Sequence, residues 1–182
     1  MKTRWAFGMI LASGLLLGFA SAGAAGDLHP FVKLGLDMNG NYDTPYGFTD
    51  RFLYQFGLDV PVTGMIGVGG EFDYQKKSGE ETELGVTVKD SASLYQFFGN
   101  VVIAPDNDNQ IKPYGFAGFG AAHVTFEIKH ADEVELSGSV TKAALQAGAG
   151  LMISHFLADV KIVHIFAEDY ETDVYASIGF RF

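Results

Sequence analysis

The feature that most limits the fold of this 182-residue chain is a repeated alternation of apolar residues with polar or small ones. The end of the chain shows it most clearly. There the apolar positions are Val174, Ala176, Ile178, Phe180 and Phe182. A period of two is typical of a β-strand with two different faces. The chain is therefore predicted to be all-β.

The same alternation divides the chain into eight predicted strands. They cover residues 31–39, 52–60, 66–75, 95–103, 114–126, 142–153, 156–166 and 173–182. The connections at 61–64, 105–110 and 154–155 are short, and those at 40–51, 76–92, 127–140 and 167–172 are longer and more polar. In an antiparallel meander the long and short connections gather at opposite ends. This asymmetry is typical of an up-and-down transmembrane β-barrel.

Alternation alone also fits a soluble eight-stranded barrel of the lipocalin type. The sizes of the side chains on the two faces distinguish this alternative from a membrane barrel. One face is rich in Phe, Tyr, Leu, Ile and Val, whereas the other carries glycines and isolated charges. Side chains just fill the interior of an eight-stranded barrel, and the bulky face is too large for it. That face is therefore predicted to point outward to lipid, where a closed barrel satisfies every backbone hydrogen bond.

The N-terminal segment has the pattern of a secretory signal peptide. Lys2 and Arg4 precede an apolar run that ends near Ala20, and small residues follow it. The run is shorter than a helix needs to cross a bilayer. We expect residues 1–25 to be removed and residues 26–182 to form one barrel domain in a bacterial outer membrane.

Ionisable residues on the small-residue face are expected to line the barrel interior. Charges of both signs in a narrow lumen pair with one another, because an unpaired buried charge is costly. The prediction is a polar plug, with a gated path for small solutes as the alternative. Its members are Lys33, Asp59, Asp159, Lys161 and Arg181 toward the periplasmic end, and Asp37, Glu71, Asp73 and Lys142 higher in the lumen.

Two segments carry a resemblance to a known family. The final strand, with Ile178, Phe180 and Phe182, is similar to the C-terminal signal that the outer-membrane barrel assembly machinery reads. The glycine-rich segment 113–120 is similar to a strand common in small outer-membrane barrels. The chain thus resembles the superfamily that includes OmpA-type, OmpX-type, OmpW-type and opacity-type proteins. This resemblance implies outer-membrane lipid, lipopolysaccharide and the assembly machinery as partners, and its OmpW-type members suggest passage of small apolar compounds as an alternative role.

Composition excludes several other functions. The chain has no cysteine, which excludes disulfide scaffolds, thiolate metal sites and thiol catalysis. A formal net charge of −10 argues against a nucleic-acid partner, since phosphate binding needs clustered Lys and Arg. The five His are too dispersed for metal-ligand spacing, and no cofactor is expected.

An enzymatic role requires a nucleophile beside a base. Lipid A deacylases are similar in size and carry a His-x-Ser element on a lipid-facing strand. The nearest counterpart here is His123-Val124-Thr125, which has Thr in place of Ser and is expected on the lumen-facing side. His164 is expected to face lipid, without a Ser beside it in sequence. No enzymatic activity is expected, and a lipid-modifying enzyme is the least favoured alternative.

The long connections are the remaining candidates for function, because exposed loops on a rigid scaffold commonly bind partners. Alternating apolar residues at 84–88 and 134–136 predict that strands continue above the membrane as a projecting sheet. The edge of such a sheet can pair with a partner strand. A structural or surface-interaction role is therefore predicted. The acidic loop residues are expected to be solvated, with bridging divalent cations as the alternative. They are Glu80, Glu81, Glu83, Asp132, Glu133, Glu135, Glu168, Asp169 and Glu171.

Overall fold

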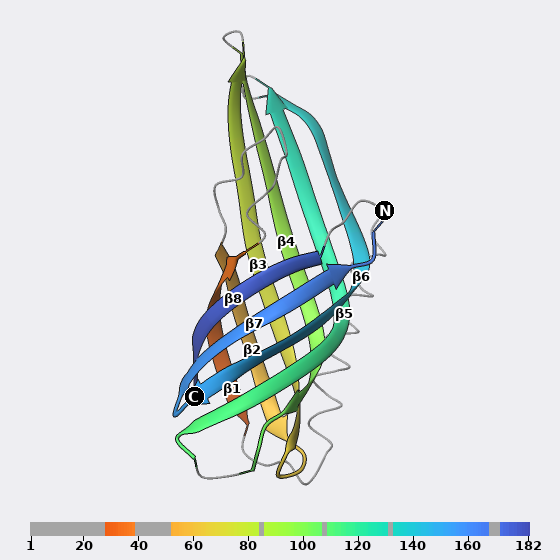
Figure 1. Cartoon of the computed structure of the whole chain (residues 1–182). Coiled ribbons are helices and arrows are strands. Elements are labelled where there is room, and N and C mark those ends of the chain that lie inside the picture. Colours follow the sequence, from red (N-terminus) through yellow and green to blue (C-terminus); the bar gives the residue numbers. More distant parts are fainter. Residues whose placement is uncertain (1–27, 39–51, 84–85, 107–108, 131–132, 168–171) are drawn as a thin grey trace.

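The structure is a computed structural model that describes residues 28–38, 52–83, 86–106, 109–130, 133–167 and 172–182. These residues form one closed barrel of eight antiparallel strands in sequence order (Figure 1). The strands are β1 (His29–Asp37), β2 (Phe52–Pro61), β3 (Ile66–Glu83), β4 (Val86–Ile103), β5 (Ile111–His130), β6 (Glu133–Ile153), β7 (Phe156–Ile165) and β8 (Thr172–Arg181). The predicted eight-stranded barrel is confirmed. The expected signal peptide, 1–25, lies outside the described residues.

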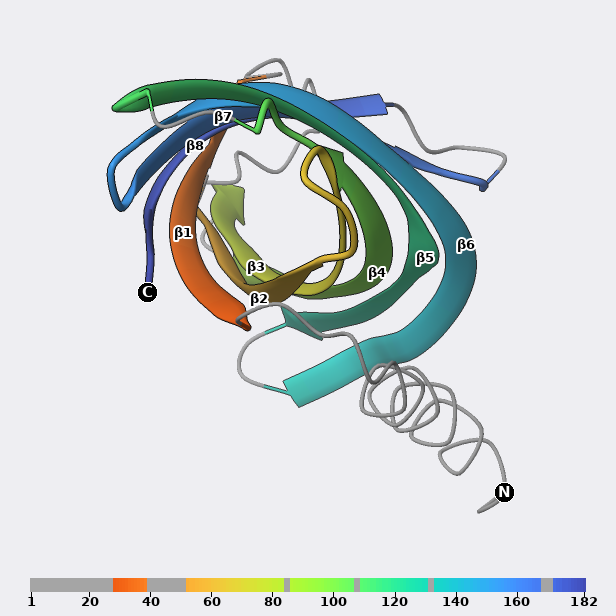
Figure 2. The same ribbon diagram turned by 90° about the horizontal axis from the view of Figure 1, so that it is seen from below.

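The first and last strands close the barrel. β1 pairs with β8 from Phe31 opposite Arg181 to Asp37 opposite Tyr175. Figure 2, the view from below, shows the strands curving around a central lumen. Closure leaves no unpaired strand edge within the ring, which is what a hydrocarbon environment demands. Among the described residues, no helix is long and apolar enough to cross a membrane.

The strands differ in length by a factor of two. β1, β2, β7 and β8 have 9 or 10 residues each, whereas β3 to β6 have 18 to 21. The additional length lies at one end of the barrel and forms a projecting sheet, made of residues 76–83, 86–93, 125–130 and 133–143 (Figure 1). The connections predicted at 76–92 and 127–140 are thus mostly strand. Cross-strand pairing holds these segments in regular structure beyond the barrel.

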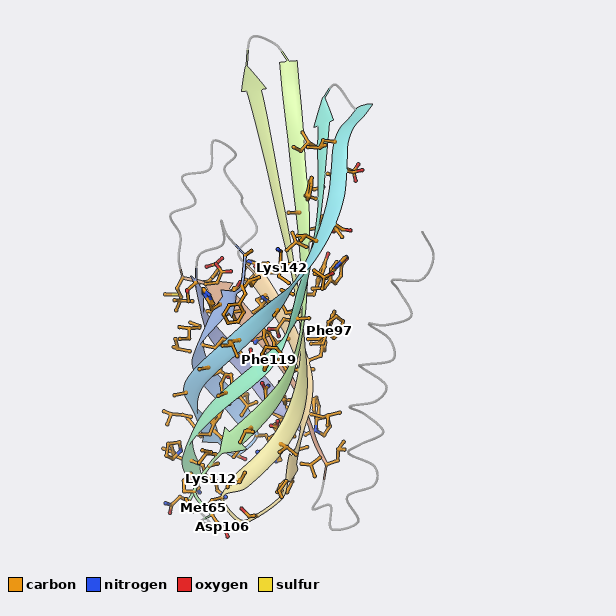
Figure 3. All side chains as sticks on the ribbon, turned by 90° about the vertical axis from the view of Figure 1, so that its right-hand side faces the viewer. Met65, Phe97, Asp106, Lys112, Phe119 and Lys142 are labelled. Carbon is orange, nitrogen blue, oxygen red and sulfur yellow. The ribbon has the colours of Figure 1, made fainter. Side chains whose placement is uncertain are left out.

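Large apolar side chains cover the outside of the barrel, as predicted (Figure 3). Phe56 on β2 and Phe97 on β4 each have half of their surface exposed. Phe119 has 63% exposed and points outward from the glycine-rich part of β5. The intervening residues point inward, because successive side chains of a strand face opposite sides. The outward apolar face therefore meets lipid.

Tight turns join the strands at the end opposite the projecting sheet. After β2, the Thr63 hydroxyl oxygen accepts the backbone N–H of Ile66 at 3.1 Å, which reverses the chain within a few residues. Between β6 and β7 the turn consists of Ser154 and His155, and Ser154 has a φ of 55°. We refer to this end of the barrel, opposite the projecting sheet, as the short-turn end.

Candidate functional site

An ion-pair network fills the middle of the lumen. Lys161 on β7 contacts Glu71 at 2.7 Å and also contacts Asp73, both on β3. Lys33 on β1 contacts Asp159 at 3.1 Å and Glu71 at 3.4 Å. All five side chains are buried. The structure thus brings five of the nine predicted lumen residues into one network.

Neutral side chains extend the network. Gln55 Nε2 donates to Glu71 at 3.3 Å, and the Tyr114 hydroxyl donates to Asp159 at 2.7 Å. Gln146 accepts from Lys161 at 3.2 Å and donates to Asn100 at 2.8 Å. The predicted lumen network contained only charged residues and therefore lacked these neutral members. Their inward-facing positions in the period-two alternation would have identified them.

Of the other four predicted residues, Asp59 and Arg181 border this network, because they line one cavity together with Lys33 and Glu71. This cavity lies at the short-turn side of Lys33 and has about 40 Å³, a volume comparable to that of one or two water molecules. Asp37 is buried at the far end of β1.

Lys142 requires a correction, because it is exposed rather than part of the lumen plug. It lies where the projecting sheet leaves the barrel (Figure 3). Pairing between β6 and β7 begins at Ala144, so the barrel wall opposite Lys142 has already ended.

The lumen next to the projecting sheet contains a cluster of buried apolar side chains, which the alternation pattern alone did not predict. Its buried members include Leu53, Leu94, Phe98 and Tyr175. The Tyr175 hydroxyl donates to Gln75 at 3.2 Å, so its polar end is satisfied. The lumen therefore contains an ionic layer and, beside the projecting sheet, a layer of apolar side chains that also holds the buried Gln75, Gln96 and Asp173.

Aromatic rings form a row on the outer wall at the level of the lumen's apolar layer. The rings of Tyr54 and Tyr74 lie 6.4 Å apart, and those of Tyr74 and Tyr95 lie 5.2 Å apart. Such a row is typical of the aromatic girdle at a membrane interface.

His123 continues this row, which corrects the expected lumen-facing position. Its ring lies 6.4 Å from that of Tyr95, and its Nδ1 lies 2.7 Å from the Thr141 hydroxyl oxygen. His164 is exposed, as expected, and its Nδ1 lies 3.1 Å from the Thr172 hydroxyl oxygen. Among the described residues, no three His, Asp or Glu side chains are grouped to hold a metal ion.

The final strand presents aromatic rings on the outer wall at the short-turn end. The ring of Phe180 packs edge-on against Phe156 at 5.4 Å. The Phe182 backbone N–H donates to Pro30 at 2.9 Å, and Ile178 is exposed. The end of the chain is thus held in the barrel wall.

The projecting sheet has two different faces. The face continuous with the lumen side of β5 and β6 is apolar, because Val124, Phe126 and Ile128 pair with Val140, Gly138 and Leu136. The opposite face pairs Thr125 with Ser139 and Glu127 with Ser137. The acidic side chains predicted in the loops lie outside the described side chains.

The comparisons with known proteins agree with this architecture. A family model described as "Outer membrane protein beta-barrel domain" matches residues 10–182. The chain belongs to this family. Its location is the bacterial outer membrane. No curated protein sequence matches the chain.

Solved structures show the same fold at low sequence identity. Ail, the attachment invasion locus protein of Yersinia pestis, is 19% identical with a TM-score of 0.50, and the match covers 85% of this chain and 96% of Ail. Neisserial surface protein A is 11% identical with a TM-score of 0.57, and the match covers 86% of this chain and 97% of that protein. Ail has also been crystallised with the heparin analogue sucrose octasulfate.

Proposed function

We propose that this protein is a non-conducting, non-enzymatic surface barrel whose projecting sheet binds an extended polypeptide by strand addition. The observation that carries the proposal is the unequal strand length. β6 has 21 residues, but β7 beside it has 10 and pairs only with the segment from Ala144 to Ile153. The remaining half of β6 therefore presents a strand edge above the membrane.

The filled lumen supports a scaffold role over transport. The ion pairs of Lys33 and Lys161 cross the middle of the barrel, and the apolar layer around Phe98 occupies the lumen above them. Passage of a small apolar compound would require both layers to rearrange. Removing one partner of a buried ion pair leaves an uncompensated charge, which makes such a rearrangement costly.

The composition of the projecting segments favours a polypeptide over a sulfated polysaccharide. In 76–92 and 127–140, acidic residues outnumber basic ones, and the whole chain has a formal net charge of −10. An anionic polymer of the kind represented by the Ail ligand would be repelled. Strand addition instead draws its affinity from backbone hydrogen bonds, which are independent of charge.

Peptide binding tests this proposal. The protein is placed in liposomes, and fluorescent ten-residue peptides with alternating apolar and polar residues are titrated by anisotropy. Binding is expected for the alternating peptides and not for scrambled ones of the same composition. A Ser139→Pro variant is expected to lose binding, because Pro cannot donate a backbone hydrogen bond, while Ser139→Thr retains it. Equal binding by both variants would contradict strand addition.

Export and assembly complete the proposal. Residues 1–25 are removed on export, and the barrel assembly machinery reads Ile178, Phe180 and Phe182 on the final strand. The girdle tyrosines on the outer wall contact the lipopolysaccharide leaflet. Mass spectrometry of the mature chain tests the cleavage site. Phe182→Ala is expected to reduce the amount of assembled barrel in cells.

A further inference from the structure

We propose that the partner strand is supplied by a second copy of this chain in a facing outer membrane, through antiparallel pairing of the two β6 edges. This inference rests on the proposed strand addition and names its partner. A joint of this kind would hold two cells together.

The first support is the orientation of the backbone along the β6 edge. The carbonyl oxygen of Ala143 accepts the Phe166 backbone N–H at 3.0 Å, so Ala143 faces the β7 side. In an antiparallel ladder, every second residue directs both backbone groups to the same neighbour. Ser137, Ser139 and Thr141 therefore direct theirs to that side as well. Within the described part of the chain, no strand pairs with them there.

The second support is the near-symmetry of this edge about Gly138. Leu136 and Val140 flank it at equal distances on one face, and Ser137 and Ser139 flank it on the other. If two copies pair antiparallel with Gly138 opposite Gly138, each Leu136 lies opposite a Val140, and each Ser137 lies opposite a Ser139. Directly opposed side chains share a face, so the apolar and hydroxyl faces both continue across the joint. The chain thus carries its own complementary strand.

The third support is the contrast between the two edges of the projecting sheet. Natural edge strands are protected against pairing by charged residues and Pro. The β3 edge, 76–83, contains Lys76, Lys77, Glu80, Glu81 and Glu83. The β6 edge, 133–143, contains Glu133, Glu135 and Lys142, and its central stretch from Leu136 to Thr141 is uncharged. The β6 edge is therefore the one left open.

The apolar face gives the joint additional surface. Leu136 has 54% of its surface exposed, and Val140 has 41%. The ring of Phe126 lies over Gly138, because a Cβ atom on Gly138 would come within 2.5 Å of that ring. Across the joint, Leu136 and Val140 of one copy would cover their counterparts in the other.

The membrane decides where the second copy must lie. In one membrane, every β6 runs from the tip of the projecting sheet toward the bilayer. Antiparallel pairing requires an inverted copy, which only a facing membrane supplies. One joint contains few hydrogen bonds, but many joints form at once where two surfaces meet, and their affinities combine.

Clumping of proteoliposomes tests the inference with two charge-reversed variants. In the proposed register, Leu136→Glu/Val140→Glu places like charges opposite each other, and so does Leu136→Lys/Val140→Lys. Turbidity should rise in wild-type liposomes, and about tenfold more slowly in either variant alone, since like charges directly opposite disfavour pairing. A mixture of the two variants should regain the wild-type rate. The matched control is Lys142→Ala, which is expected to clump like the wild type.

The outcomes separate this inference from the proposed function. If wild-type liposomes do not clump but alternating peptides still bind, self-pairing is wrong and strand addition stands. If neither occurs, both are wrong. Clumping that the mixture of charge variants fails to restore would also reject the β6 register.

Discussion

Lys161 Nζ and Glu71 Oε1 lie 2.7 Å apart across the lumen and connect β7 with β3. Three strands separate β7 from β3 in either direction around the barrel. The contact therefore joins opposite walls directly, whereas the backbone ladder joins only neighbouring strands. Asp73 contacts the same ammonium group, so one lysine is shared by two carboxylates of one strand.

Replacing Lys161 with Met is expected to destabilise the barrel strongly. Glu71 would keep the longer ion pair with Lys33 and the hydrogen bond from Gln55, and Asp73 would lose its contact with Lys161. Breaking a buried pair by removing one partner costs about 3–5 kcal/mol. The measurement is the urea midpoint of unfolding in detergent micelles. Lys142→Met, at an exposed position, is the control, and equal midpoints for the two variants would refute the network's role in stability.

The lumen is expected not to conduct ions. Lys161→Gln and Arg181→Gln remove one cation from the network and one from the cavity beneath it. Because the apolar layer remains above both positions, neither variant should open steps of conductance in planar bilayers. Conductance in the wild type that changes in either variant would instead support the gated path. Liposome swelling with small sugars provides an independent reading.

Gly57 is expected to tolerate no side chain, in contrast to Gly70 on the neighbouring strand. A Cβ atom at Gly57 would come within 2.3 Å of the Phe31 ring and 2.6 Å of the Gly70 carbonyl oxygen. At Gly70 the nearest atom is 3.9 Å away. Gly57→Ala should therefore lower stability by about 1–3 kcal/mol, the usual cost of overpacking. Gly70→Ala should unfold near the wild-type urea midpoint, and the reverse order would be inconsistent with the packing.

Charged substitutions should locate the membrane on the strands. Phe119 lies on the outer wall nearer the middle of the barrel, four residues before the girdle residue His123 (Figure 3). Lys at the bilayer midplane costs about 2–4 kcal/mol, and the cost falls toward the interfaces. Phe119→Lys should therefore impair folding into lipid vesicles. Leu136→Lys, in the projecting sheet, should fold like the wild type. A similar loss of folding for this variant would mean that Leu136 lies in the membrane rather than above it.

The barrel and its orientation were predictable because two sequence properties point the same way. Alternation fixes which residues lie on opposite faces of a strand, as Gln55 and Phe56 do on β2. Volume then decides that Phe56 faces outward, because a narrow lumen has no room for a full set of rings. The extension of β3 to β6 was predicted only in part, since the polar residues at 76–92 also suit a loop.

The distribution of the lumen residues was less predictable. Alternation places Lys142 and Lys161 on the same side of the wall, but it carries no information about height. Height depends on cross-strand register, which leaves Lys142 above the last β7 residue. The predicted facing of His123 was wrong because small residues occupy both faces of β5. Side-chain size therefore does not distinguish the two faces there, and the outward position of Phe119 is seen only in the structure.

The two layers that fill the lumen have a consequence for the whole cell. A barrel that does not conduct, as we propose for this one, adds no leak to the permeability barrier, however many copies the envelope carries. The number of copies in the outer membrane can then follow the need for surface contacts. A high density of such barrels would give antibiotics and detergents no additional path across the membrane.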